Sequence, residues 1–204
     1  MTDRRVLFFG DSLVAGVGDP TGLGWVGRLV AASFAAGLPV TAYNLGVRGE
    51  TSLQVAARVR QETGARLSAA ADTRIVMSFG ANDTTIEDGV QRVETQRSRD
   101  ALNDILERAR TIELPTLVVG PAPVDDTEQN RRIERLSVAF DELCRSRGVP
   151  FLTVIDTLLG CEVWSRQVAS RDGAHPAAAG YQALTELVLS GGWLDWLRSC
   201  SAPT

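Results

Sequence analysis

The sequence of 204 residues contains no lysine, one histidine and three cysteines. All 21 basic residues are therefore arginines, and they are interspersed among 25 aspartates and glutamates. Binding to nucleic acid requires a patch or stripe of basic side chains, and none is visible here. We expect no nucleic-acid partner.

The cysteines, Cys144, Cys161 and Cys200, are odd in number and far apart in the chain. This pattern argues against a disulfide framework, and a single histidine makes a zinc site untenable. We expect neither a bound metal nor a cofactor.

Long hydrophobic runs are also missing. The apolar run Val6–Phe9 is too short for the core of a signal peptide, and no stretch approaches the roughly 18 apolar residues of a membrane span. We expect a cytoplasmic protein with no membrane association. The sequence does not indicate an oligomeric state.

Short apolar runs alternate with stretches of helical period along the whole chain. The runs are rich in Val, Ile, Leu and Phe and do not alternate with polar residues, as in strands buried on both faces. This order predicts one α/β domain, residues 1–204, with about five parallel strands between helices. Residues 16–27 and 157–172 are expected to be long irregular connections. The expected strands are residues 5–9, 40–45, 74–79, 116–119 and 151–155.

Residues capable of catalysis follow these strands. Segments 10–13, 44–51 and 80–83 come after the first three strands, and segment 172–176 follows the fifth strand and its long connection. Ligands of open parallel sheets bind beyond the carboxyl ends of the strands. We therefore expect all four segments to meet at one edge of the sheet.

These segments provide a nucleophile and a base. A serine hydroxyl is weakly nucleophilic at neutral pH unless a positioned base takes its proton, and His175 is the only histidine available to Ser12. Asp172, three residues before His175, is placed to accept the Nδ1 proton and fix the tautomer. The pattern predicts a catalytic triad of Ser12, Asp172 and His175.

Acyl transfer also needs hydrogen-bond donors for the oxyanion of its tetrahedral intermediate. The backbone N–H of Ser12, the N–H of Gly49 and the carboxamide of Asn82 are the candidates. Gly46 lies in the same turn as Gly49 and is an alternative donor.

The four segments together resemble the sequence blocks of the GDSL, or SGNH, hydrolases. Gly10-Asp11-Ser12-Leu13, Asn44 to Thr51 with Gly49, Gly80-Ala81-Asn82-Asp83 and Asp172-Gly173-Ala174-His175-Pro176 match in order and spacing. The resemblance implies a flavodoxin-like, three-layer α/β/α fold and an esterase or lipase with the triad and oxyanion hole named above. It implies as substrates acetylated sugars, aryl esters, thioesters or lysophospholipids.

Other residues have weaker assignments. Trp25 and Trp164 are candidates to line the cleft, although Trp25 also fits a buried helical stripe. Arg48 is a candidate ligand for an anionic substrate group or a partner in a salt bridge within its turn. Asp11 and Asp83 are assigned structural roles, binding backbone amides.

Pro176 suits the first position of a helix, so His175 is expected to cap that helix. This would hold the imidazole at the end of a rigid element.

We thus expect an esterase acting on a small-molecule ester, with short acyl groups favoured because no lid-sized insertion is evident. One alternative is a catalytically silent binding protein for an acylated ligand, and another is thioesterase or lysophospholipase activity at the same site. A flavin or nucleotide module is disfavoured, because segment 16–20 lacks the glycine spacing of a dinucleotide loop.

Overall fold

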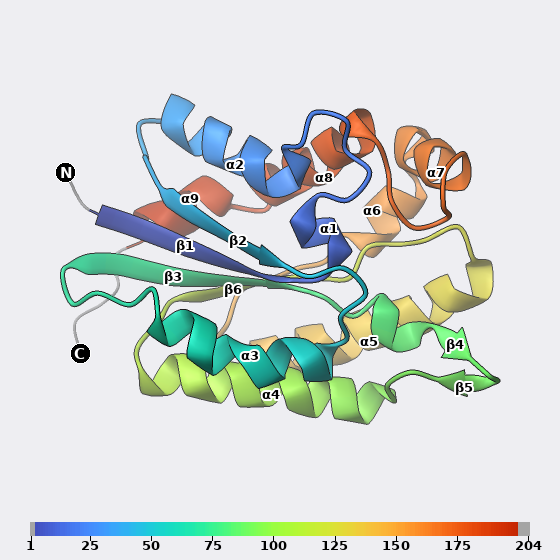
Figure 1. Cartoon of the computed structure of the whole chain (residues 1–204), viewed down its shortest axis with the longest axis horizontal. Helices are drawn as coiled ribbons and strands as arrows, with labels where there is room; N and C mark the ends of the chain where they lie inside the picture. Colours follow the sequence, from blue (N-terminus) through green and yellow to red (C-terminus); the bar gives the residue numbers. More distant parts are fainter. Residues whose placement is uncertain (1–2, 200–204) are drawn as a thin grey trace.

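The computed structural model describes residues 3–199, which form a central sheet between two layers of helices (Figure 1). The five main strands are all parallel and lie in the order β2-β1-β3-β6-β7. The predicted fold class is confirmed. The strands are β1 (Asp3–Gly10), β2 (Thr41–Gly46), β3 (Ala71–Ser78), β6 (Thr116–Val119) and β7 (Phe151–Leu152).

Helices cover both faces of the sheet. One layer contains α2 (Gly24–Ala35), α6 (Ile155–Leu159), α7 (Glu162–Ala169), α8 (Ala178–Ser190) and α9 (Trp193–Arg198), and the other contains α3 (Ser52–Gly64), α4 (Thr95–Thr111) and α5 (Thr127–Ser146) (Figure 1). No helix in the described part of the chain is long and apolar enough to cross a membrane.

The alternation of side chains along β1 divides the core into two halves. Val6 and Phe8 point into the layer of α2, α8 and α9, whereas Leu7 and Phe9 point toward α3, α4 and α5. All four side chains are fully buried. A strand buried on both faces needs such a continuous apolar run, and that run was the sequence signal for β1.

Two glycines allow the short helix α1 (Ser12–Ala15) to lie against the ends of the strands. A Cβ on Gly10 would come within 2.5 Å of the Val14 side chain, and a Cβ on Gly46 would come within 2.2 Å of the Ala15 backbone nitrogen. Any larger residue would push α1 away from β1 and β2. Ser12 therefore starts its helix at the carboxyl edge of the sheet.

Three predicted elements are wrong in detail. The fifth strand ends at Leu152 rather than Ile155, because Ile155 already begins α6. The segment 157–172 is not irregular, since it contains most of α6 and all of α7. Segment 16–27 is irregular only until α2 begins at Gly24.

A small hairpin was not predicted. Strands β4 (Ile86–Glu87) and β5 (Val90–Gln91) pair antiparallel across Asp88 and Gly89, which both have positive φ. Asp-Gly is the preferred sequence for such two-residue turns, so the signal was present. Figure 1 shows the hairpin projecting at the same end of the sheet as α1.

Candidate active site

The Ser12 side chain lies in the first turn of α1, directly after β1. The preceding Asp11 accepts a hydrogen bond on its Oδ1 from the backbone N–H of Leu13, at 3.0 Å, and so caps the helix. Among the described residues, the N–H of Ser12 has no hydrogen-bond acceptor, as expected at a helix start. Ser12 thus provides both its hydroxyl and a free backbone N–H at the start of α1.

The structure brings together the three residues of the predicted triad from opposite ends of the chain. The distance from His175 Nε2 to Ser12 Oγ is 2.7 Å, and the distance from His175 Nδ1 to Asp172 Oδ2 is also 2.7 Å. With Nδ1–H donated to the carboxylate, Nε2 is left as the acceptor for the Ser12 hydroxyl. The His175 side chain is 9% exposed and its bond to Ser12 is buried, whereas the Asp172 side chain is about half exposed.

Asp172 is held in its ionised form. Burial raises the pKa of this carboxyl, but hydrogen bonds from the His175 ring and from the backbone N–H groups of His175 and Ala174 outweigh it and lower the pKa to about 2. A carboxylate charged at neutral pH stabilises a neighbouring imidazolium.

The expectation that His175 caps the following helix is wrong. Helix α8 begins at Ala178, and the side chain of Gln167 on α7 provides the cap. Its Oε1 accepts the backbone N–H groups of Ala177 at 2.9 Å and Gly180 at 2.8 Å. Gln167 therefore fixes the segment after His175, a role that no motif in the sequence indicated.

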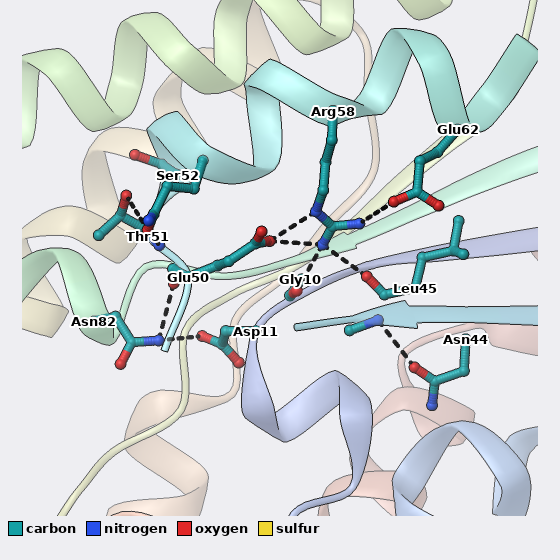
Figure 2. A network of polar contacts seen from close by, with 12 residues as sticks. Gly10, Asp11, Asn44, Leu45, Glu50, Thr51, Ser52, Arg58, Glu62 and Asn82 are labelled. Carbon is teal, nitrogen blue, oxygen red and sulfur yellow. Dashed lines mark hydrogen bonds and ion pairs between the residues drawn. The ribbon is translucent and has the colours of Figure 1, made fainter. Parts of the chain in front are cut away.

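The carboxamide of Asn82, at the start of the short helix η1 (Asn82–Thr84), lies beside Asp11 (Figure 2). Its Nδ2 donates to the backbone oxygen of Glu50 at 2.9 Å and contacts Asp11 Oδ2 at 3.5 Å, the limit of a hydrogen bond. One hydrogen of the amide is therefore firmly held and the other only weakly. The weakly held hydrogen is available to a substrate oxygen.

The two candidate glycines differ in their N–H groups. The N–H of Gly46 donates to the Asn44 side chain at 3.1 Å, and Gly46 is the last residue of β2. Gly49 has a φ of +79°, and its N–H has no acceptor within residues 3–199. The geometry favours Gly49 as a donor over Gly46.

Two buried aspartates flank the site and bind backbone amides, as their assigned structural roles require. Asp83 Oδ1 accepts the N–H of Ser52 at the start of α3, at 2.8 Å, and burial raises the pKa of Asp83. Burial also raises the pKa of Asp11, to about 7, and the nearby Asp83 and Glu50 carboxylates add to this shift.

The three candidate substrate contacts have different outcomes. Trp25 is fully buried in the core, with its ring centre 5.8 Å from that of Phe8, and cannot reach a substrate in this structure. Trp164 is 1% exposed and donates its indole N–H to the backbone oxygen of Pro123. Arg48 is exposed, and its Nη2 lies 3.9 Å from Asp172 Oδ2, so its ion partner is outside its own turn.

A cavity of about 300 Å³ opens beside Ser12 and His175. Neither Trp25 nor Trp164 lines it, and nine of its fourteen lining residues carry polar side chains. No group of three or more potential metal ligands is found within the described residues. The cavity is lined by residues 11–13, 81, 82, 85, 124–126, 129 and 172–175.

A parallel α/β sheet with this serine, histidine and aspartate at its carboxyl edge is the arrangement of the SGNH ester hydrolases. Residues 8–183 match the model of the GDSL-like lipase/acylhydrolase family, so the chain belongs to this family of hydrolases. No curated protein sequence matches it significantly.

Solved structures share the fold. The lipase/acylhydrolase from Enterococcus faecalis superposes with a TM-score of 0.75 at 21% identity, covering 98% of this chain and 100% of the other. Axe2, an acetylxylan esterase from Geobacillus stearothermophilus, gives 0.79 at 17% identity, covering 98% of both chains. TesA gives 0.75 at 22% identity, covering 92% of this chain and 97% of the other.

Proposed function

We propose that the protein is a serine esterase that hydrolyses small carboxylic esters through an acyl-enzyme on Ser12. The observation that carries this proposal is the continuous chain of hydrogen bonds from Asp172 through His175 to Ser12, each 2.7 Å long. In variants of Axe2 described as catalytic mutants, a serine, an aspartate and a histidine are replaced, the last two three positions apart. Asp172 and His175 have the same spacing.

In the proposed first step, Ser12 Oγ attacks the ester carbonyl carbon while His175 Nε2 takes the hydroxyl proton. The carbonyl oxygen becomes an oxyanion that accepts hydrogen bonds from the N–H groups of Ser12 and Gly49 and from Asn82 Nδ2. The C–O bond to the alcohol then breaks, and the alcohol oxygen receives the proton from Nε2.

In the second step, water attacks the acyl-Ser12 carbonyl and gives a proton to His175 Nε2. The oxyanion forms again on the same donors and collapses with release of the carboxylic acid, and Ser12 Oγ regains its proton. Asp172 stabilises the imidazolium in both steps without taking up a proton.

The cavity supports short acyl groups and a polar alcohol. Its volume of about 300 Å³ is at the small end for ligand sites, and Asp125, Asp126 and Gln129 form part of its wall. A larger apolar groove of about 350 Å³ lies between α3 and α4, lined by residues such as Ile105 and Ile112, but none of the proposed catalytic residues borders it. The cavity beside Ser12 is thus small for a long acyl chain, and the larger groove is separate from the proposed catalytic residues.

A panel of substrates tests this proposal. We expect p-nitrophenyl acetate and butyrate to be hydrolysed faster than the decanoate, and we would assay an acetylated sugar and an acyl-thioester beside them. Ser12→Ala should reduce turnover by about 10⁴-fold or more and abolish labelling by a fluorophosphonate, whereas Ser165→Ala, an exposed serine on α7, should do neither.

Wild-type turnover by folded Ser12→Ala would refute the nucleophile assignment. A wild-type protein that binds acylated ligands but neither turns them over nor reacts with the fluorophosphonate would instead be the silent binding protein. Location in the cytoplasm remains part of the proposal.

A further inference from the structure

The guanidinium group of Arg58, on α3, joins the segments from which the oxyanion donors come (Figure 2). Its Nη2 donates to the backbone oxygens of Leu45 at 2.7 Å and Gly10 at 3.2 Å, next to the last residue of β2 and at the last residue of β1. These two hydrogen bonds fix the position of the guanidinium at the carboxyl edge of the sheet.

The same guanidinium also binds the carboxylate of Glu50. Arg58 Nε lies 2.8 Å and Nη2 lies 2.7 Å from one carboxylate oxygen, Glu50 Oε2. The backbone oxygen of Glu50 in turn accepts the firmly held hydrogen of Asn82 Nδ2, at 2.9 Å. The orientation of the Asn82 carboxamide therefore depends on Glu50, and the position of Glu50 depends on Arg58.

Arg58 is itself well fixed. Its Nη1 lies 3.1 Å from Glu62 Oε1, one turn further along α3, and its guanidinium carbon lies 5.6 Å from the centre of the Phe9 ring. The side chain is 16% exposed. A planar group with five donors in a fixed fork can serve these partners together, whereas a lysine ammonium cannot.

We propose that Arg58 is a positioning residue for ester hydrolysis, which holds the Asn82 carboxamide toward the oxyanion through Glu50. The inference rests on the proposed function, because it assigns Asn82 to the oxyanion hole. Arg58 does not line the cavity beside Ser12, so it acts through other residues. Oxyanion donors are effective only about 2.7–3.1 Å from the developing charge, and small misplacements are costly.

Replacement of Arg58 and a matched arginine tests this. Arg66 lies just after the end of α3, pairs with Glu62 at 3.3 Å and stacks over the Tyr43 ring at 5.3 Å, but it contacts none of the segments that carry Ser12, Gly49 and Asn82. We expect Arg58→Met to lower kcat/KM for p-nitrophenyl acetate by about 30- to 100-fold. Arg66→Met should change it less than about twofold, although both variants lose a partner of Glu62.

A double-mutant cycle separates positioning from general destabilisation. If Arg58 acts through Asn82, Arg58→Met should cost less than about fivefold in kcat/KM when introduced into Asn82→Ala. Equal costs in both backgrounds, or a folded Arg58→Met with wild-type activity, would overturn the proposal. Should Arg58→Met fail to fold, Arg58→Lys carries the same cycle, because it keeps the charge but loses the fork.

The failure of this inference is distinct from failure of the proposed function. If Ser12→Ala and Asn82→Ala lose activity while Arg58 variants do not, only the role of Arg58 is refuted. If Ser12→Ala retains activity, the proposed function itself is refuted.

Discussion

Both oxygens of the Asp172 carboxylate accept a hydrogen bond from His175. Oδ2 accepts from the ring Nδ1 at 2.7 Å, and Oδ1 accepts from the His175 backbone N–H at 2.9 Å. One side chain thereby sets the rotation of the imidazole and the fold of the loop that bears it.

This double contact makes Asp172→Asn a severe substitution. A carboxamide has one accepting oxygen and one donating nitrogen. Its NH2 group would therefore face another donor, either the ring Nδ1–H or the backbone N–H of His175, and one of the two hydrogen bonds would be lost. We expect kcat/KM to fall by about 10³- to 10⁴-fold with the fold intact, measured by ester hydrolysis and circular dichroism. A loss below tenfold would show that the carboxylate does not control the tautomer.

The pH dependence of activity should have one acid limb. The pKa of Asp172, lowered to about 2, keeps its charge constant above about pH 4, so Asp172 should contribute nothing to the acid limb above that pH. Protonation of the base stops proton transfer from Ser12, so the logarithm of kcat/KM should fall toward acid, and Asp11, whose pKa is raised to about 7, also gains its proton in this range. A flat profile from pH 4 to pH 9 would contradict a histidine base.

Asp11 should make folding stability depend on pH in the opposite sense to a salt-bridged carboxylate. Its pKa is raised from 3.8 to about 7, so the folded state binds an additional proton between these values. Its contribution is complete below about pH 4 and is lost as pH rises through about 7.

The unfolding free energy of Asp11→Asn relative to wild type should thus increase from pH 4 to pH 8, by at most about 4 kcal/mol. Urea denaturation at several pH values measures this. Asp195→Asn, whose side chain is 85% exposed, should show no comparable change. A difference that does not vary with pH would contradict the protonated state of Asp11.

Asn82→Ala should reduce kcat/KM by about 10²- to 10³-fold, because an oxyanion donor is lost. The nucleophile and base are untouched, so the variant should still react with a fluorophosphonate, but more slowly. Asn103→Ala on α4, away from the cavity, is the control. Full activity of Asn82→Ala would remove this residue from the proposed mechanism.

Gln167→Ala should weaken both the fold and catalysis. Two backbone N–H groups at the start of α8 would lose their acceptor, at a cost of about 1–2 kcal/mol in unfolding free energy. Because Ala177 is only two residues from His175, we also expect a several-fold loss in kcat. Gln182→Ala, exposed on α8, should alter neither thermal stability nor turnover.

The meeting of Ser12, Asn82 and His175 was predictable because parallel strands bring their carboxyl ends to one edge. Four strands were also located closely, since fully buried runs such as Val6–Phe9 have few alternatives. Helix α7 was missed because its exposed residues dominate its sequence. Its apolar signal is the pair Trp164 and Val168, one turn apart and both buried.

Arg58 and Gln167 were not predictable from the sequence. Both act on backbone groups of segments that are distant in the chain or on another element, such as Gly10, which is 48 positions from Arg58. Backbone donors and acceptors are the same for almost every residue type, so they leave no pattern in the sequence. Trp25 was a candidate for the cleft although it also fitted the buried stripe of its helix, and the structure places it in the buried stripe.

The sole histidine of this chain lies at the center of its hydrogen-bonded chain to Ser12 and Asp172. An NMR spectrum of the uniformly ¹⁵N-labelled protein would therefore contain a single imidazole spin system, with no assignment problem. Its two nitrogen shifts would report directly on tautomer and protonation in wild type and in every variant described above.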